Sequence, residues 1–477
     1  MAIERNGLIE VCFQNEKGVD SMHFSKVVRH FTILTAFLLF IVNIVIAGDE
    51  DTASKIMTKI HGYASLEGGE IVKGLAFSGA IPVDHAWLHT YYMGIYLDAA
   101  ISDRLRIIVG GEAQYLIPFR RYELGNNEIY VQNRAPKTVF NIKWGEAQYT
   151  FSIGENLHFQ LEAGLFPYKY NPEARNLGEV LYRSYCYPAS IISEFDKPYA
   201  ELIGFRFGNS ISLGNNVFHH DLMLTTQNDF IPYQDFSLSY LTGFTISGLL
   251  NVGAGVVWWD LLHGFAAGAE TTTGIGDDPT TPDIPEWGGK YYTFAGTKVM
   301  GRISIDPKGF LSQGLSEVFG KEDLKLYGEV TVLGLKNYHG DSVLFNGNMI
   351  WRPSFYDTLE QRVSVMFGMN IPAFKLLDVL SLEFEYQNSP YANSIQKPIY
   401  ELKPLPNVMF AAKEHAKWKW SLYAKRKLLN HVSIIGQVAR DHIIPETFEM
   451  ANTFADVTDV TLRPGDYWWT IKMRFDI

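Results

Sequence analysis

Apolar and polar residues alternate along several long segments of the chain. In residues 105–117, Leu105, Ile107 and Val109 are apolar, whereas Arg106 and Glu112 are charged. Successive side chains of a β-strand point to opposite faces, so this alternation predicts a strand with one apolar and one polar face. The same period recurs in residues 157–163, 380–387 and 469–477.

The length of these segments favours strands that cross a membrane. The predicted strands that contain these segments extend over roughly 10 to 14 residues, whereas strands of soluble proteins usually have about 5 to 6. A tilted membrane-spanning strand needs about 9 to 11 residues. A secreted soluble β-protein is the alternative, and strand length argues against it.

The connections between these segments alternate between short and long. Short ones are predicted at residues 101–103, 153–156, 209–215, near Asn251, 306–322, 371–379 and 427–431, with 306–322 the longest of them. Longer ones are predicted at residues 72–87, 118–136, 167–198, 229–234, 261–289, 337–360, 389–414 and 441–465. Outer-membrane barrels alternate short periplasmic turns with long outside loops. The pattern predicts an all-β fold, a closed antiparallel transmembrane barrel of about 16 strands, with about 14 to 18 as the range that strand boundaries leave open.

Residues 241–259 contain no charge and are long enough for a transmembrane helix. They also contain Gly243, Gly248, Gly253 and Gly255, with the polar Asn251 among them. We therefore predict a hairpin of two strands that turns near Asn251. A helix is the alternative.

The N-terminal segment has the order of a secretory signal peptide. Residues 31–47 are uncharged, Lys26 and Arg29 precede them, and Ala47 is followed by an acidic run. This order predicts cleavage after Ala47, so that residues 1–47 form the signal and residues 48–477 a single barrel domain. Met22 opens a segment of ordinary signal length and is the predicted true start. An uncleaved inner-membrane anchor is the alternative, because the run is just long enough to span.

Composition and charge exclude several classes of protein. The chain is 47% hydrophobic and 19% charged, which is typical neither of a disordered chain nor of a helical membrane protein. Its net charge of −11 has the wrong sign for a broad nucleic-acid interface, so we expect no nucleic-acid partner. Two cysteines cannot build a disulfide framework or a multi-cysteine metal site.

Aromatic residues gather near the predicted strand ends, where interfacial girdles occur in membrane barrels. They are Trp258, Trp259, Trp418, Trp420, Tyr467, Trp468 and Trp469. With this pattern, residues 53–477 resemble bacterial outer-membrane β-barrels of the porin type. Residues 164–169 are also similar to a segment of phosphate-selective porins. The chain departs from the resemblance at its end, Phe475-Asp476-Ile477, because such barrels commonly finish on Phe or Trp.

The resemblance implies a location in the outer membrane of a Gram-negative bacterium. It implies a channel for passive or weakly selective diffusion of small solutes or ions, surrounded by outer-membrane lipid. A homotrimer is one candidate assembly. No cofactor is implied.

If the apolar face meets lipid, the polar face lines the lumen. Because alternate residues of a strand point to opposite faces, the residue positions place twelve bases and seven acids on that face. The predicted pore-lining residues are Arg104, Arg106, Arg206, Lys298, Arg302, Lys325, Arg362, Glu383, Glu385, Lys417, Lys419, Lys425, Lys472 and Arg474. The other acids counted are Glu112, Glu146, Glu162, Glu329 and Asp476. Lys143 is left out of the count, because a β-bulge near Gly145 would reverse parity.

The surplus of bases predicts a mild anion preference, because rings of Lys and Arg favour anions. The alternative is that these charges are solvated and balanced by their neighbours.

The third outside loop, residues 167–198, combines several charges with five tyrosines. The resemblance implies that this loop folds inward and narrows the pore. Its predicted constriction residues are Lys169, Glu173, Arg175, Glu179 and Arg183. A tethered surface loop is the alternative. Asp277, Asp278 and Asp283 in the glycine-rich loop at residues 261–289 lack the spacing of a calcium loop, so no metal site is predicted.

Enzymatic signatures are weak. Glu383 and Glu385 would lie about 6.5 to 7 Å apart on one strand face, near the spacing of glycosidase carboxylates, but lumen acids are commoner. The chain contains no metalloprotease, nucleophile-elbow or phosphate-loop motif, so we predict no catalytic residue. The alternative functions are a surface structural or binding barrel without an open pore and, less favoured, an outer-membrane barrel hydrolase.

Overall fold

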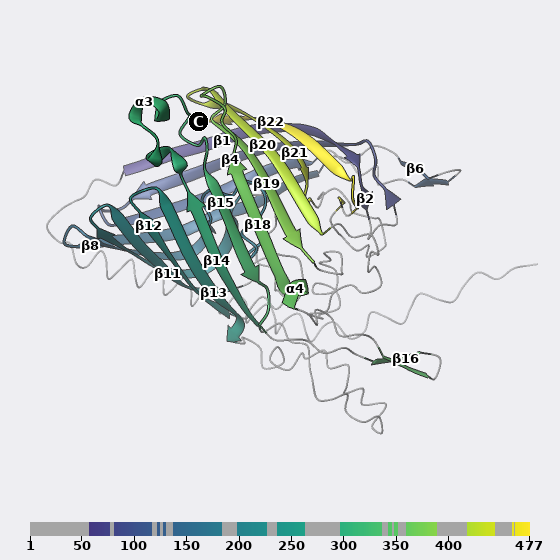
Figure 1. Ribbon diagram of the computed structural model, residues 1–477, viewed down its shortest axis with the longest axis horizontal. Helices are drawn as coiled ribbons and strands as arrows, with labels where there is room; N and C mark the ends of the chain where they lie inside the picture. The colour runs from purple at the N-terminus through teal and green to yellow at the C-terminus, as the bar shows by residue number, and fades with distance from the viewer. Residues whose placement is uncertain are drawn as a thin grey trace, which may run out of the picture. The chain divides into compact units, whose positions relative to one another are not determined.

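Sixteen antiparallel strands pair into one closed ladder (Figure 1). The computed structural model describes residues 57–76, 81–116, 122–124, 127–129, 137–183, 198–226, 236–262, 296–335, 342–345, 348–351, 359–388, 417–443, 460–461 and 463–477. The predicted signal peptide and Met22 lie outside these residues, as does the acidic loop with Asp277, Asp278 and Asp283. Residues 57–477 form one compact unit.

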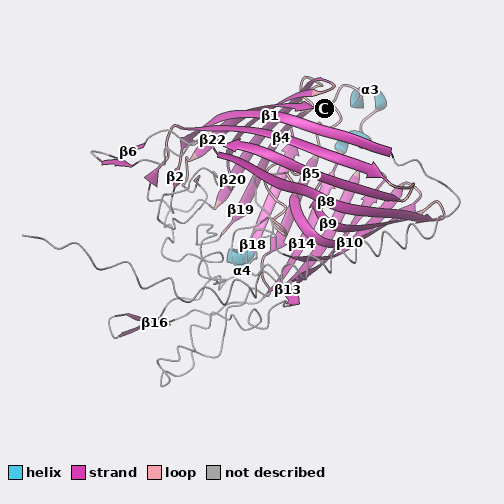
Figure 2. Cartoon of the chain, turned by 180° about the vertical axis from the view of Figure 1, so that it is seen from behind, coloured by secondary structure: helices cyan, strands magenta, loops and turns pink. Residues whose placement is uncertain are grey.

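The barrel wall contains strands of very different lengths. They are β1 (Met57–Lys73), β4 (Ala86–Ala100), β5 (Leu105–Leu116), β8 (Lys137–Ile153), β9 (Leu157–Tyr168), β10 (Ala200–Leu213), β11 (Asn216–Thr226), β12 (Phe236–Ile246), β13 (Leu250–Leu262), β14 (Gly296–Ile305), β15 (Leu326–Val332), β18 (Val363–Asn370), β19 (Val379–Gln387), β20 (Trp418–Leu429), β21 (Val432–Arg440) and β22 (Tyr467–Asp476). Figure 2 shows β1, β4, β5, β8 and β9 side by side from behind.

Smaller elements lie in the connections. Three short hairpins are formed by β2 (Leu75–Ala76) with β3 (Ile81–Pro82), β6 (Tyr122–Leu124) with β7 (Asn127–Ile129), and β16 (Ser342–Phe345) with β17 (Asn348–Trp351). The short helices are η1 (Pro307–Phe310), α3 (Gln313–Ser316) and α4 (Leu359–Arg362). No helix of the described residues is long and apolar enough to span a membrane.

The ladder closes where the first strand meets the last. β1 pairs with β4 on one side and with β22 on the other, with Tyr63 opposite Asp476. Gly62 and Ile477 exchange two backbone hydrogen bonds of 3.1 and 2.7 Å. Because every wall strand has two neighbours, the wall has no free edge strand, and the backbone groups of its paired residues are satisfied within the sheet.

The strand number and the alternation of connections agree with the sequence prediction. The closed antiparallel barrel of 16 strands is confirmed. The hairpin predicted in residues 241–259 is confirmed, but its turn lies between Ile246 and Leu250, and Asn251 belongs to β13. The link between β14 and β15 is the longest at its end of the barrel because it contains η1 and α3.

The outer face of the wall is apolar, as the alternation predicts. Along β4, Trp87, Tyr91, Met93, Ile95 and Leu97 are exposed, whereas Asp98 on the other face is buried. A bulge in β8 leaves Lys143 between the paired residues Ile142 and Trp144, opposite Gly110 and Gly111. This position is two residues from the bulge predicted at Gly145. As expected, the bulge exchanges the faces to which even-numbered and odd-numbered residues point, because Ile142 before it is 69% exposed whereas Glu146 after it is buried.

A basic residue on the apolar outer face will oppose insertion into lipid. Ile95→Arg, at a position that is 57% exposed on β4, is expected to cost about 2–4 kcal/mol of folding free energy in a bilayer. The matched variant Gln437→Arg places the same charge on the inward face of β21 and should cost much less. Urea titrations of folding into phosphatidylcholine vesicles compare the two. Equal costs would contradict this assignment of the faces.

Candidate functional site: the barrel interior

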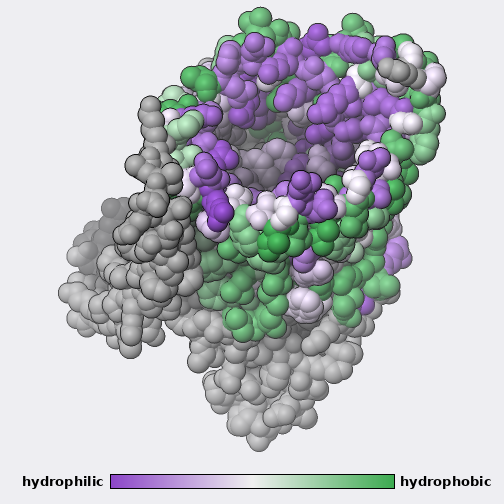
Figure 3. Space-filling view, turned by 90° about the vertical axis from the view of Figure 1, so that its left-hand side faces the viewer, coloured by the Kyte–Doolittle hydropathy of each residue, from purple (hydrophilic) through white to green (hydrophobic). Residues whose placement is uncertain are grey.

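The inward face of the wall is polar and surrounds a hollow. Figure 3 shows hydrophilic side chains lining an opening at one end of the barrel, with hydrophobic side chains around the outside. A cavity of about 760 Å³ lies among the short turns and the adjoining strands β8 to β11. Its polar lining includes Asp103, Arg104, Thr150, Ser152, His158, Gln160, Arg206, Ser210, His219 and Asp221. The part of the interior beside these turns and β8 to β11 therefore has room for water and small solutes.

Ten of the predicted pore-lining residues lie on strands at inward positions. They are Arg106, Arg206, Lys298, Arg302, Glu383, Glu385, Lys419, Lys425, Lys472 and Arg474. The other four lie just beyond strand ends. Arg104 is in the turn before β5, Lys325 directly precedes β15, Arg362 ends α4, and Lys417 is exposed directly before β20. The role of all fourteen residues in lining a pore stays a prediction.

The sequence count of inward charges omitted three acids, and each of them is paired with a counted base. Lys472 contacts Glu67 at 2.7 Å, Arg106 Nε donates to Asp98 at 2.6 Å, and Arg206 Nε donates to Asp221 at 2.9 Å. Arg206 also contacts Glu162 at 2.8 Å. The count also omitted an inward base, Lys59 of β1, which lies opposite Asp98. The surplus of inward bases is therefore smaller than twelve bases against seven acids suggests, but it remains.

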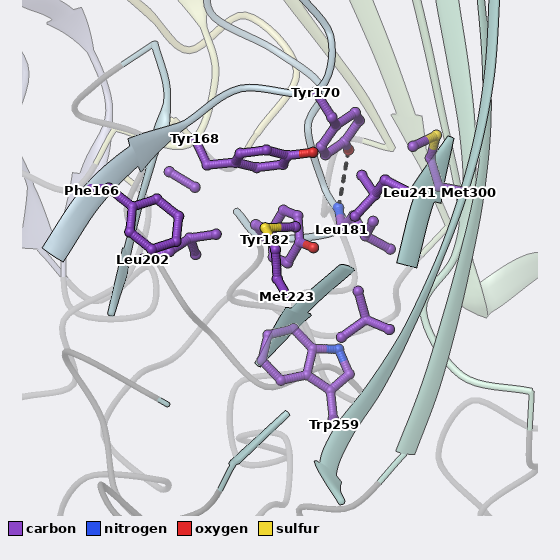
Figure 4. Close-up of a cluster of buried hydrophobic side chains, with 12 residues drawn as sticks. Phe166, Tyr168, Tyr170, Leu181, Tyr182, Leu202, Met223, Leu241, Trp259 and Met300 are labelled. Atoms are coloured by element: carbon purple, nitrogen blue, oxygen red, sulfur yellow. Dashed lines mark hydrogen bonds between the residues drawn. The ribbon is translucent and has the colours of Figure 1, made fainter. Parts of the chain in front are cut away.

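The segment that follows β9 folds into the barrel. Within residues 169–183, Asn171, Leu177 and Leu181 are buried. Figure 4 shows Tyr170, Leu181 and Tyr182 of this region packed with side chains of β9 to β14. The cluster comprises Phe166, Tyr168, Tyr170, Leu181, Tyr182, Ala200, Leu202, Met223, Leu241, Val257, Trp259 and Met300. We call residues 169–183 the inward segment.

Glu383 on β19 binds the backbone of the inward segment. Its carboxylate accepts hydrogen bonds from the backbone N–H groups of Arg175, Asn176 and Leu177 at 2.5, 2.8 and 2.9 Å. It also accepts from the Tyr327 hydroxyl at 2.7 Å. A buried carboxylate is costly unless hydrogen bonds replace its water, and buried N–H groups need acceptors. The wall carboxylate and the N–H groups of the segment therefore satisfy each other's need for hydrogen-bond partners.

Two further carboxylates extend this attachment. Glu385 accepts from the Gly178 N–H at 3.0 Å. Glu329 on β15 accepts from the Tyr170 hydroxyl and from the Asn171 side chain, both at 3.0 Å. The inward segment is thus held on the arc of wall formed by β15 and β19.

A second connection also enters the interior. Asp441 and His442, which follow β21, are buried. His442 Nε2 lies 2.6 Å from Glu385 Oε1, and the Trp468 indole N–H donates to Asp441 at 2.8 Å. Asn176 of the inward segment donates to Asp441. Glu385 therefore contacts both inward connections. No pattern in the sequence predicts that the second one enters the interior.

The predicted constriction residues are anchored in different ways. Glu173 contacts Lys325 at 3.1 Å, and Arg175 contacts Glu322 at 2.9 Å. Lys169 Nζ donates to the carbonyls of Ala174 and Pro198, both at 2.6 Å. Glu179 accepts from the Asn171 N–H at 2.8 Å, and Arg183 donates to the Asn176 carbonyl at 3.4 Å. All five lie on the segment that enters the barrel.

Burial and partners shift the pKa of several of these groups. Burial raises the pKa of Glu179 and lowers that of Lys169. Burial also disfavours the charge of Lys325, but the neighbouring Glu173 and Glu322 outweigh it and raise its pKa. Lys325 therefore stays charged at neutral pH.

Comparison with known proteins gives no sequence relative. The chain matches no model of a protein family and no curated protein. Among solved structures, a triple mutant of Rhodopseudomonas blastica porin is 8% identical with a TM-score of 0.38, covering 88% of this chain and 100% of that chain. OmpF of Salmonella typhi, in complex with daunomycin, is 9% identical with a TM-score of 0.41, covering 88% and 97%. Both are porins, the class that the sequence resembles.

Loss of the Glu383 charge will loosen the inward segment. Glu383→Gln keeps the size of the side chain but replaces one acceptor by a donor, which is expected to weaken the attachment by about 2–3 kcal/mol. Cleavage by trypsin at Arg175 should then accelerate in the folded protein. Glu67→Gln, which alters an inward acid paired with Lys472 on the opposite arc, is the control. Equal cleavage of both variants and the parent would refute the attachment.

Proposed function

We propose that the protein is a bacterial outer-membrane channel through which small hydrophilic solutes and ions diffuse passively. The closed sixteen-strand barrel, apolar outside and hollow and polar inside, supports this proposal most directly. Lipid offers no hydrogen bonds, so only helices and closed barrels can span it. The apolar outer face would contact the lipid, and the polar inner face would contact water.

The inward segment narrows the interior in this proposal. Its attachment to Glu329, Glu383 and Glu385 keeps it on one arc of the wall. In this proposal, the space left for solutes lies toward β1, β4 and β5 on the opposite arc. It lies on the turn side of a buried apolar cluster at the long-loop end of β1, β4 and β22, formed by Ile71, Val83, Ala86, Ala439, Val460 and Trp468. Solutes would pass between the segment and this arc and then reach the cavity at the turn end.

Charge selectivity is expected to be weak. Most inward bases whose contacts are described have an acid or a carbonyl beside them, as Arg206 has Glu162 and Asp221, and Lys419 has the Asp441 carbonyl at 2.8 Å. A paired charge attracts a passing ion less than a free one. The mild anion preference stays a prediction that a reversal potential can test.

A barrel closed by its own connections is the second candidate. The burial of both the inward segment and residues 441–442 favours it, because these two connections share the interior near Glu385. Such a barrel would have a structural or binding role at the cell surface. A hydrolase is less favoured, since the carboxylates of Glu383 and Glu385 are bonded to the inward connections.

Planar-bilayer recordings of the refolded barrel separate these candidates. We expect stepwise conductance, because the interior is polar and hollow, and a reversal potential close to zero in a salt gradient, because the inward charges are paired. Stable insertion without conductance would reject the channel in favour of the closed barrel. A strongly anion-selective or cation-selective reversal potential would reject weak selectivity.

A further inference from the structure

Three aromatic side chains cover part of the inner wall opposite the inward segment. Tyr63 of β1, Tyr96 of β4 and Trp144 of β8 lie at inward positions and are partly exposed. The rings of Tyr63 and Tyr96 are 6.0 Å apart and nearly parallel, with an interplanar angle of 19°. Trp144 meets Tyr96 edge-on at 4.4 Å. We call these three residues the aromatic platform.

Glycines let these rings lie flat against the wall. The strand register places Tyr63 opposite Gly94, and it places both Tyr96 and Trp144 opposite Gly110. A Cβ atom at Gly94 would collide with the Tyr63 ring, and one at Gly110 would collide with the Tyr96 ring. An aromatic ring laid over a strand glycine covers its backbone and fixes the ring. The platform is therefore a built feature of the wall.

Charged and polar groups border the platform. The Tyr63 hydroxyl donates to Glu112, and Arg474 Cζ lies 4.0 Å from the centre of the Tyr63 ring. One row nearer the long loops, the Gln114 amide donates to the Tyr92 hydroxyl at 3.2 Å. The guanidinium thus covers Tyr63. On the other side of the platform, the Tyr199 ring lies 6.3 Å from Trp144 at a tilt of 34°, and Tyr96 and Trp144 both stay partly exposed.

This arrangement has the chemistry of a site for a pyranose sugar. A pyranose ring has an apolar face of C–H groups and an edge of hydroxyls. An aromatic face offers a flat apolar contact, whereas carboxylate and guanidinium groups accept and donate hydrogen bonds at its border. Small-molecule sites combine such an apolar lining with a few placed polar groups.

We infer that the aromatic platform binds neutral oligosaccharides through Tyr96 and Trp144, with Arg474 engaging their hydroxyls. The inference deepens the proposed channel function and names one class of solute for it. The site lies where the wall has no described contact with the inward segment, so a sugar would meet it during passage. Binding in turn should block the ion current for as long as the sugar stays.

The test uses maltohexaose as the neutral probe on the refolded full barrel. Binding in detergent micelles is followed by tryptophan fluorescence, which does not depend on conduction, and Trp144→Phe assigns the signal. In a planar bilayer, maltohexaose should interrupt the current in a concentration-dependent way. Polyethylene glycol of equal hydrodynamic radius, which has no pyranose face, should interrupt it far less.

Variants on one strand separate the platform from the rest of the wall. Tyr96→Leu is expected to weaken maltohexaose binding roughly three- to tenfold, the effect of one lost aromatic contact. Tyr91→Leu changes the same residue type on the outer face of β4 and should leave binding unchanged. Heat-modifiable migration on gels confirms that both variants are folded.

The outcomes distinguish this inference from the channel itself. Conductance without maltohexaose binding overturns the sugar site and leaves the channel standing. Binding without conductance supports the site and overturns the channel. Equal loss of binding in Tyr96→Leu and Tyr91→Leu, or equal block by polyethylene glycol, overturns the role of the platform.

Discussion

The attachment of the inward segment to wall carboxylates determines what the interior can do. Glu383 receives three successive backbone N–H groups, and Glu385 receives the next one, from Gly178. Hydrogen bonds to a charged acceptor are the strong ones, and each is stronger still away from water. Without these carboxylates, the buried N–H groups of the segment would lack partners, and the segment would be held inside only by Glu329 and its apolar contacts with β9 to β14.

This attachment depends on the closed wall and divides the interior. Glu329 and Glu383 face the same space only because β15 and β19 both neighbour β18 in the ladder. The segment occupies that side, and the aromatic platform lies on β1, β4 and β8. The cavity lies among the turns at one end. One arc is thus bonded to the inward segment, and in the proposed channel solutes would pass along the other.

The sequence predicts the wall well because the wall obeys a local rule. Alternation with period two and the order of short and long connections depend on neighbouring residues, so strand number and faces follow from them. The turn predicted near Asn251 lies slightly earlier, between Ile246 and Leu250, since that apolar hairpin has little polar contrast to mark its ends. The bulge was predicted within two residues because Lys143 and Glu146 break the period.

The interior could be predicted only in part, because its contacts join residues far apart in the chain. Nothing near Glu383 in sequence indicates that it binds Arg175, about two hundred residues earlier. The pairing of Arg206 with Asp221 needs the register of β10 and β11, which sets them across a hairpin. The cover of Gly110 by Tyr96 likewise appears only once β4 and β5 are aligned. A count of charges by alternate positions along each strand does not show which bases and acids pair across neighbouring strands.

The most direct test of this account compares the single-channel conductance of the parent with that of the double variant Glu383→Gln/Glu385→Gln. If wall carboxylates hold the segment that narrows the pore, the variant must show larger and more variable conductance steps, at unchanged folding into the membrane. Conductance steps identical to those of the parent would contradict the account, because the segment would then stay in place without the charges proposed to hold it.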